Sequence, residues 1–328
     1  MTTENAWGPD SSGDALAQRI RSLAAAGAFA EADALREQLL RAHPGAINLI
    51  VSTGEYIEEE KTKRLDSEHL ALWQDLYDEL SEEETNTLYY RLKQDRIPSG
   101  KVIFFQGKPN NRLFFVEEGE VTLFFRTAAK NVALATVGRG SILGEDTFFG
   151  ISFCTFSAVT RSEVSFRHLS RTDSAGWPDD QPGLFDKLRD WSHRVGRAEE
   201  AVKQKNLERR THPRYPLTAL ATAVILDRDG RATSSYFKGA VVDLSRSGIC
   251  FSMKCSKKET ARALLGRQVQ ISLTVEGRQE PLLQERGTIV KLSFLLHNDY
   301  HVHVKLATTI DQKVFKTFPC SWSEPVDR

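Results

Sequence analysis

The stretch Tyr236-Phe-Lys-Gly-Ala-Val-Val-Asp-Leu-Ser-Arg-Ser-Gly-Ile-Cys-Phe251 decides how the C-terminal part of the chain folds. Its two ends, Tyr236–Val242 and Ile249–Phe251, are rich in the β-branched and aromatic residues that strands favour. The residues between them, Asp243–Gly248, must then form a tight connection. Gly248 permits either a positive φ or the close approach of another backbone segment. The stretch therefore predicts two neighbouring strands joined by a short turn.

A second motif, Arg210-Thr-His-Pro-Arg214, precedes this turn and follows a polar run, Ala201–Glu208, that is compatible with a helix. A residue before proline is pushed away from the α region, so Pro213 and Pro216 predict that the helix ends near Arg209. The arginines would then lie on an extended arm. Their planar guanidinium groups can grip phosphates through paired hydrogen bonds and stack on purine faces.

The turn offers groups that suit the same kind of ligand. The carboxylate of Asp243 can accept hydrogen bonds from the N1 and N2 hydrogens of a guanine, and Ser245 adds a hydroxyl donor. A guanine also presents its O6 and N7 acceptors to an arginine. The two motifs together predict an anion- and guanine-binding surface. The sequence leaves one alternative open, a solvated charged arm and an Asp-Ser turn that hydrogen-bonds to itself.

Short strands follow one another through the C-terminal domain, and one stretch, Lys257–Leu265, has helical character. The predicted strands are 219–226, 236–242, 249–253, 269–275, 287–292 and 301–306, with a turn at Asp227–Gly230. Six strands indicate a small closed barrel. The spacings R-x-x-x-R and D-x-S-x-x-G, in this order and context, resemble the PilZ domain, a bacterial receptor module for cyclic diguanylate (cyclic di-GMP). The resemblance covers about Glu208–Ile310.

The PilZ resemblance implies which residues bind the ligand. They are Arg209, Arg210, Arg214, Asp243, Ser245 and Gly248. In this family a basic residue just before the arginine motif, here Arg209, often accompanies the binding of a stacked ligand dimer. The implied mechanism is a switch in which bound ligand folds residues 209–214 onto the barrel and repositions the helix before them.

Between Ile97 and Ser170 apolar residues alternate with polar ones, and glycines separate the short runs. This pattern predicts an antiparallel barrel or jelly roll. Three segments carry a specific resemblance: Lys101-Val-Ile-Phe-Phe-Gln-Gly107, Leu113-Phe-Phe-Val-Glu-Glu-Gly119 and Leu143-Gly144-Glu145. They are similar to the cyclic-nucleotide-binding domain of catabolite activators and kinase regulatory subunits, over about Leu80–Ser170.

In that family a glutamate after a glycine binds the ribose hydroxyl, and an arginine about nine residues later binds the cyclic phosphate. Glu145 stands at the glutamate position, but the segment Phe153-Cys-Thr-Phe-Ser157 contains no arginine. The resemblance leaves Gly144, Glu145, Thr155 and Ser157 as a candidate pocket for cAMP or cGMP. A missing charge-assisted pair costs about 1.5–3 kcal/mol, so a barrel kept as a scaffold or dimer module is the alternative.

The N-terminal part is predicted to be helical. Asp14–Ala26 and Ala28–Ala42 carry apolar residues at helical spacing and predict a helical hairpin for docking or dimerisation. The alternative is a single unit that resembles a tetratricopeptide repeat. The charge run Glu58–Arg64 is interpreted as a solvated connector. Ser81-Glu-Glu-Glu84 is a capping box that begins another helix, on which Tyr89 and Tyr90 are expected to be packing residues.

A proline-containing stretch, Asp173–Gly183, predicts a loop after the first barrel. Helical spacing then continues from Leu184 to Val202. In the cyclic-nucleotide-binding family a helix at this place dimerises and transmits change. A contact within the chain explains the same pattern, and the sequence leaves both alternatives open.

The composition is that of a soluble protein, with 328 residues, 40% of them apolar and 27% charged, and no net charge. Balanced charge disfavours nucleic acid as a partner, and neither a membrane span nor a signal peptide is apparent. The four cysteines lack C-x-x-C spacing, which fits reduced thiols in a cytoplasm. We expect no metal or cofactor, because His301 and His303 fit one face of a partly exposed strand and the sequence shows no catalytic motif.

The predicted fold class is mainly β with a helical N-terminus, comprising two β-barrels joined by a helical linker: a cyclic-nucleotide-binding-like jelly roll and a six-stranded PilZ barrel. The predicted domains are a helical hairpin region (1–65), the first barrel domain (66–172), a linker and helix (173–207) and the PilZ domain (208–328).

The predicted function is a non-enzymatic, cytoplasmic bacterial signalling receptor. It binds cyclic di-GMP through its PilZ domain and passes a conformational change to a protein partner, with a homodimer among the expected assemblies. Two alternatives stay open. One is a ligand-independent adaptor with degenerate barrels, and the other is a dual sensor that also binds a cyclic mononucleotide in the first barrel.

Overall fold

A computed structural model describes residues 13–126, 130–196, 212–277, 280–295 and 298–320. The chain divides into two compact units. The helical unit comprises residues up to 95 together with 167–194, and the barrel unit comprises residues 96–166 together with 195–328. Strands account for 36% of the described residues and helices for 34%, which confirms a mainly β fold with a helical N-terminus.

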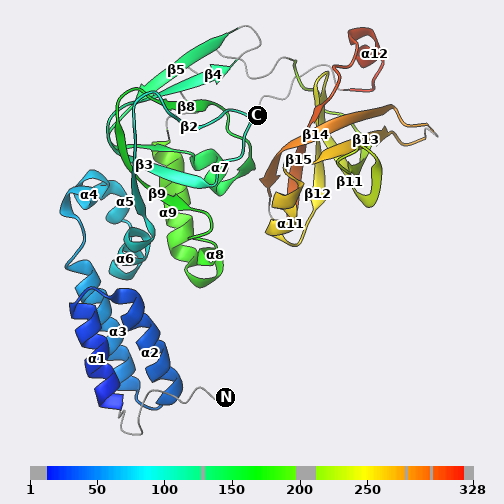
Figure 1. Cartoon of the computed structure of the whole chain (residues 1–328). Coiled ribbons are helices and arrows are strands. Elements are labelled where there is room, and N and C mark those ends of the chain that lie inside the picture. The colour runs from blue at the N-terminus through cyan, green and yellow to red at the C-terminus, as the bar shows by residue number, and fades with distance from the viewer. Residues whose placement is uncertain (1–12, 127–129, 197–211, 278–279, 296–297, 321–328) are drawn as a thin grey trace. The chain divides into compact units, whose positions relative to one another are not determined.

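The N-terminus is a bundle of three helices that lie side by side (Figure 1). They are α1 (Gly13–Ala25), α2 (Phe29–Ala42) and α3 (Ile47–Thr62). The predicted hairpin corresponds to α1 and α2, but the predicted connector was wrong for residues 58–62, which belong to α3. The physical reason is that α3 buries one face, through Ile50, Thr53 and Ile57, while its charged residues occupy the rest of its surface.

Further short helices complete the helical unit. They are α4 (Ser67–Leu72), α5 (Gln74–Tyr77), α6 (Glu82–Arg91), α8 (Trp177–Asp180) and α9 (Pro182–Val195). The predicted capping box is confirmed at the start of α6: the Ser81 hydroxyl accepts from the Glu84 N–H at 3.2 Å, and the Glu84 carboxylate accepts from the Ser81 N–H at 2.8 Å. The predicted loop Asp173–Gly183 was wrong in part, because Pro178 lies in the first turn of α8 and Pro182 begins α9, and proline is tolerated at the start of a helix.

Helix α9 packs within the helical unit. Its apolar side chains Leu184, Leu188 and Trp191 are buried, and the Trp191 ring meets Trp73 edge to face at 5.9 Å between centroids. Lys187 forms an ion pair of 2.7 Å with Glu84. The intramolecular contact, one of the two alternatives for this helix, therefore accounts for its apolar face.

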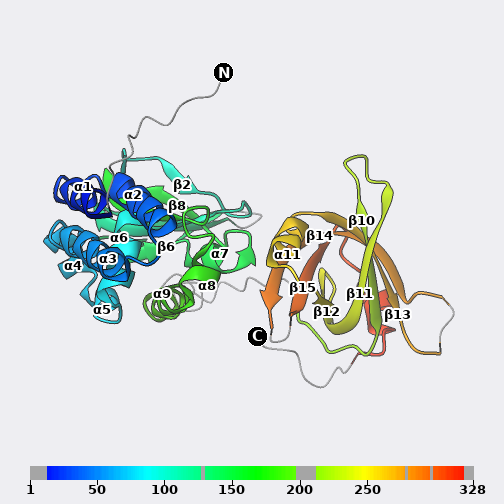
Figure 2. The same cartoon turned by 90° about the horizontal axis from the view of Figure 1, so that it is seen from below.

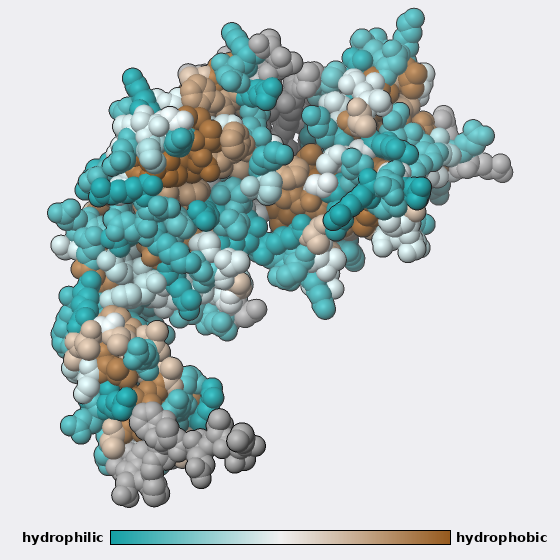
Figure 3. All heavy atoms as spheres, viewed as in Figure 1, coloured by the Kyte–Doolittle hydropathy of each residue, from teal (hydrophilic) through white to brown (hydrophobic). Residues whose placement is uncertain are grey.

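The first barrel has two four-stranded sheets, in the orders β1-β9-β3-β6 and β2-β8-β4-β5. Their strands are β1 (Lys93–Ile97), β2 (Val102–Phe104), β3 (Arg112–Glu118), β4 (Val121–Arg126), β5 (Asn131–Val137), β6 (Ser141–Leu143), β8 (Ser157–Thr160) and β9 (Val164–Ser170). Alternate residues fill an aromatic-rich core, as the period of two predicted. Figure 3 shows apolar surface, in brown, on this barrel. One large apolar side chain of the barrel, Phe105, is 58% exposed.

The second barrel closes on itself through six strands. They are β10 (Leu220–Leu226), β11 (Ala232–Ser245), β12 (Gly248–Lys254), β13 (Gln268–Thr274), β14 (Leu283–Phe294) and β15 (Asp299–Leu306). The order β13-β10-β11-β12-β15-β14 is completed by pairing of β13 with β14. Figure 2 shows α11 (Lys258–Leu264), the predicted helix, beside these strands, and a short α12 (Gln312–Lys316) follows them. The predicted six-stranded closed barrel is confirmed.

One further strand joins this sheet from the first barrel. β7 (Ile151–Ser152) follows the short helix α7 (Glu145–Phe149) and pairs antiparallel with β14. Among the described residues, no helix is both long enough and apolar enough to cross a membrane.

Candidate nucleotide-binding sites

The predicted turn is a two-residue hairpin loop between β11 and β12. The register pairs Asp243 with Cys250 and Ser245 with Gly248, so only Arg246 and Ser247 lie outside the ladder. The connection is thus tighter than the predicted span 243–248. A β-bulge between Val241 and Asp243 bends β11 just before the motif.

Arg214 and Asp243 come together at this hairpin. Tyr215 and Leu244 exchange backbone hydrogen bonds of 2.9 Å in both directions, which anchors the segment that carries Arg214 alongside the end of β11. The Arg214 guanidinium then lies 3.6 Å from the Asp243 carboxylate. This distance exceeds a normal hydrogen bond, so the two groups form an ion pair without close hydrogen-bonding geometry. Asp243 is buried, whereas the Arg214 side chain keeps 29% of its surface exposed.

Two other predicted arginines, Arg209 and Arg210, lie outside the described residues. Their place at the site stays a prediction.

The Ser245 hydroxyl is engaged by its own turn. It donates to the Gly248 carbonyl at 3.2 Å and accepts from the Ser247 N–H at 3.3 Å. A predicted role in ligand binding would require this buried hydroxyl to exchange partners. The self-bonded turn, which the sequence left open for this serine, describes its contacts here.

Gly248 is needed for close packing. Its φ is not positive, and a Cβ built at this position would lie 3.0 Å from the Val304 carbonyl oxygen of β15. Of the two roles that the sequence allowed for this glycine, the close backbone approach is the one that the structure shows.

Sequence reasoning missed two residues that hold the hairpin. Arg246 donates through Nε to the Ile310 carbonyl at 2.8 Å, and His212 Nδ1 lies 3.3 Å from the Ser247 hydroxyl. His212 sits inside the R-x-x-x-R motif, so its closeness to the arginines was the available signal. Nothing in the local sequence could have indicated the contact to Ile310, which is made far along the chain.

The candidate pocket of the first barrel is nearly filled by protein. It is a cavity of about 10 Å³, roughly the space for one water molecule. The lining residues are Phe104, Gly144, Glu145, Asp146, Thr147, Cys154, Thr155 and Phe156. Three predicted pocket residues therefore line it, and the fourth, Ser157, is not among them; its hydroxyl accepts from the Gln106 N–H at 2.9 Å.

Apolar groups occupy the place where a cyclic phosphate is expected. Cys154 and Phe156 are both buried, and burial raises the pKa of the Cys154 thiol to about 11. Gly144 has φ of +88°, and a Cβ there would lie 2.5 Å from the Arg112 carbonyl oxygen, so glycine is required at the start of α7. Gly144 and Glu145 thus begin α7 in sequence, as the resemblance placed them, but the space beside them is nearly filled by protein.

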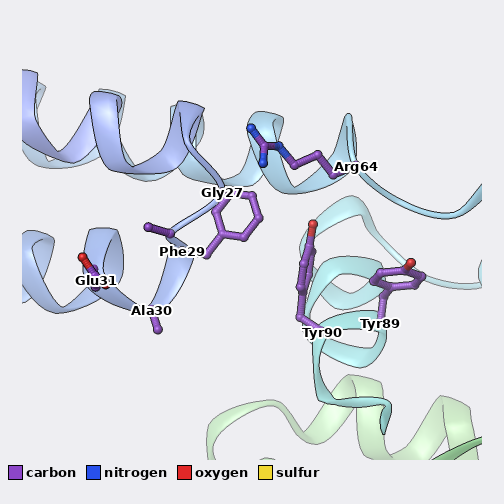
Figure 4. A pocket seen from close by; sticks show the side chains of 8 residues that line it. Gly27, Phe29, Ala30, Glu31, Arg64, Tyr89 and Tyr90 are labelled. Atoms are coloured by element: carbon purple, nitrogen blue, oxygen red, sulfur yellow. The ribbon is translucent and has the colours of Figure 1, made fainter. Parts of the chain in front are cut away.

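A larger hollow lies in the helical unit (Figure 4). It has a volume of about 470 Å³ and is lined by residues 27–31, Arg64, Tyr89 and Tyr90. The tyrosine hydroxyls have partners in the protein: Tyr90 donates to the Lys61 carbonyl at 2.9 Å, and Tyr89 accepts from the Asp66 N–H at 3.2 Å. These contacts agree with packing roles for the two tyrosines.

No group of three or more potential metal ligands occurs in the parts of the chain that the structure describes. His303 Nε2 lies 3.5 Å from the Ser293 hydroxyl of the neighbouring strand β14. His301 and His303 thus occupy a strand, as expected.

The fold comprises two β-barrel domains, and each contains a candidate nucleotide-binding site. Family comparison gives the same result: residues 94–175 match the cyclic nucleotide-binding domain, and residues 208–317 match the PilZ domain. The chain therefore contains a cyclic nucleotide-binding domain followed by a PilZ domain, as its motifs predicted.

Individual relatives resemble only part of the chain. A CRP-like cAMP-activated global transcriptional regulator of Mycobacterium tuberculosis is 29% identical over 92 residues, which are 28% of this chain and 41% of that protein. The chain thus spans less than half of this curated relative's length.

Two solved structures resemble the chain over a similar share of its length. The catabolite activator protein of Thermus thermophilus has 27% identity and a TM-score of 0.34, covering 40% of this chain and 62% of that one. A cyclic nucleotide-binding domain of Methylobacillus flagellatus has 23% identity and a TM-score of 0.35, covering 38% and 72%.

Proposed function

We propose that this protein is a bacterial receptor for cyclic di-GMP that binds the ligand at the β11–β12 hairpin of its PilZ domain. The observation that carries the proposal is the pairing of Arg214 with the buried Asp243. It brings a guanidinium and a carboxylate, the two groups that recognise phosphate and guanine, together beside one hairpin.

The ion pair is suited to exchange its partner for a ligand. The 3.6 Å separation is longer than a charge-assisted hydrogen bond, so a guanine that donates through N1 and N2 can replace Arg214 at Asp243. Arg214 is then free to bind the guanine O6 and N7 or a phosphate. Arg209 and Arg210 are proposed to complete the phosphate contacts, and Ser245 and Gly248 to hold the turn in shape.

The protein is proposed to act without catalysing a reaction and to pass the binding event to a protein partner in the cytoplasm. Both of its barrels belong to regulatory domain classes, which supports this role. The output is then a changed interface on the helical unit, the first barrel or both.

Isothermal titration calorimetry with cyclic di-GMP tests the proposal. Arg210→Ala, Arg214→Ala and Asp243→Ala should each weaken binding by at least about tenfold, the effect of losing one charge-assisted pair. Arg231→Ala is the matched control, because Arg231 is 80% exposed on the same barrel and should leave affinity unchanged. Wild-type affinity in Arg214→Ala and Asp243→Ala together would reject this site.

A further inference from the structure

The strand β7 belongs to the first barrel along the chain but packs as part of the second. Ile151 and Ser152 pair antiparallel with Leu292 and Lys291 of β14. The Ile151 side chain is 5% exposed and lies in a core cluster whose other members all come from the second barrel. The first barrel's own core cluster does not include it.

A second contact accompanies the strand pairing. Gly266, in the turn between α11 and β13, has φ of +80°, and a Cβ there would lie 3.2 Å from the Phe153 ring. The Gly266 N–H donates to the Ile289 carbonyl of β14 at 2.8 Å, so this turn is fixed to the strand that pairs with β7. Residues 151–153 thus meet a rigid surface of the PilZ domain, made by β14 and the Gly266 turn.

The same short segment lies, along the chain, between two stretches that line the cavity of the first barrel. Residues on both sides of β7 line that cavity, Glu145–Thr147 before it and Cys154–Phe156 after it. Cys154 is tied to the loop after β2, since its N–H donates to the Lys108 carbonyl at 2.9 Å and its carbonyl accepts from the Gly107 N–H at 2.8 Å. The cavity wall is therefore held by the first barrel at Cys154 and by the second barrel at Ile151.

We infer that β14 and the Gly266 turn form a docking surface for β7, and that this docking keeps the cavity of the first barrel closed. Sites for small ligands are usually about 300–1,000 Å³, so a cyclic mononucleotide could enter only if Cys154 and Phe156 moved outward. Cys154 directly follows the docked residues 151–153, so such a movement must pull β7 from β14. The PilZ domain then acts as the intramolecular partner that decides whether the first barrel can open.

Thiol labelling of the full-length protein tests this inference without any nucleotide, so the result is independent of the proposed cyclic di-GMP site. Ile151→Asp places an unpaired charge in the docking surface and should release β7. We expect a thiol reagent to modify Cys154 at least about tenfold faster in this variant, since labelling follows the population of the open state. Val102→Asp adds the same charge at an exposed site of the first barrel and should leave the rate unchanged.

Cys250, 1% exposed in the core of the second barrel, is the internal control for folding. Faster labelling of Cys154 with unchanged labelling of Cys250 supports local release, whereas an unchanged Cys154 rate overturns the inference.

A cross-link gives the opposite perturbation and does not depend on how Ile151→Asp folds. Ser152 and Lys291 are direct cross-strand neighbours, with Cβ atoms about 4.5–5.5 Å apart, so Ser152→Cys with Lys291→Cys should form a disulfide. The oxidised protein should label at Cys154 more slowly than its reduced form. Gln284→Cys, which lies about 23 Å from Lys291 toward the start of β14, is the control partner that should not cross-link to Ser152→Cys. Absence of the cross-link, or oxidation without slower labelling, would also overturn the inference.

Discussion

The Arg214 guanidinium lies 3.6 Å from the carboxylate of Asp243, whose side chain is only 6% exposed. A carboxylate that is removed from water is costly unless a positive charge or hydrogen-bond donors compensate it. Arg214 therefore has two functions that compete for the same group. It stabilises the buried carboxylate of the free protein, and it is the proposed ligand contact.

Replacing Arg214 should consequently lower stability as well as ligand affinity. We expect Arg214→Met to lower the free energy of unfolding by about 1–3 kcal/mol, because the buried carboxylate of Asp243 then loses its ion pair with Arg214. Asp243→Asn in the same background should recover part of this loss, since the buried group is no longer charged. Urea denaturation of both single variants and the double variant measures the coupling. Additive single-variant effects would mean that the ion pair contributes no stability.

The hairpin was predictable because its signals are local. Asp243, Ser245 and Gly248 stand between two strand-like runs, and each lies in the register that a tight turn requires. The local sequence could not show why position 248 must be glycine, because the Val304 carbonyl that excludes a side chain there belongs to a strand far along the chain. Local patterns thus indicated which residues form the turn, and tertiary contacts determine why they are required.

Gly239 of β11 should be the least replaceable glycine of the second barrel. A Cβ at this position would lie 1.5 Å from the Ser252 carbonyl oxygen of β12, and a backbone atom cannot rotate away. Gly239→Ala should therefore destabilise the protein by at least about 3 kcal/mol or prevent folding of the barrel. Gly45→Ala is the matched control, with no neighbour within 4 Å of the added Cβ. Thermal unfolding followed by circular dichroism compares the two, and equal midpoints would contradict the steric argument.

Two features of the structure lay beyond sequence reasoning. The start of α3, Ile47-Asn-Leu-Ile-Val51, is a short apolar run that helix and strand explain equally well, and its charged second half resembles a connector. The collapse of the first-barrel cavity was indicated only by the missing arginine. That Phe104 and Phe156 fill the space depends on the packing of strands distant in sequence.

The ion pair between Asp66 and Arg167 should make the helical unit sensitive to acid. Their charged atoms are 2.7 Å apart, and the Arg167 guanidinium also lies 4.9 Å from the centre of the Tyr89 ring. Burial raises the pKa of Asp66, but backbone N–H donors of His69 and Glu68, with the charge of Arg167, lower the pKa below its usual value overall. A lowered carboxyl pKa stabilises the fold above the unfolded pKa of about 3.9, and the contribution is lost as the pH falls through the folded pKa.

We therefore expect Asp66→Asn to cost stability at neutral pH and to cost progressively less below about pH 4. The Asp66 side chain is 41% exposed, so solvent screening limits the effect to about 0.5–1 kcal/mol. Urea denaturation at pH 7 and pH 3.5, followed by tryptophan fluorescence, measures the difference between wild type and variant. Glu163→Gln serves as the control, since Glu163 is 66% exposed and should show no such pH dependence. A stability difference between wild type and Asp66→Asn that does not shrink in acid would contradict the lowered pKa of Asp66.

One row of directly paired residues connects the proposed ligand site to the docked strand. Asp243 pairs with Cys250, Cys250 with His303, His303 with Lys291, and Lys291 with Ser152. Four strand spacings of about 4.8 Å place the two ends roughly 19 Å apart across one continuous sheet. A ligand that shifts the end of β11 can therefore change the docking of β7 through the hydrogen-bonded ladder. The coupling is measured from both ends of this row.

From the ligand end, saturating cyclic di-GMP should change the rate of Cys154 labelling by at least about fivefold, the lower end of the usual range of coupling between two sites. From the docking end, Ile151→Asp should change the affinity for cyclic di-GMP by a comparable factor, because coupling between two equilibria is reciprocal. Absence of binding to the wild type would count against the proposed receptor function and leave the docking of β7 standing. Tight binding with neither effect would show instead that the hairpin and β7 act independently.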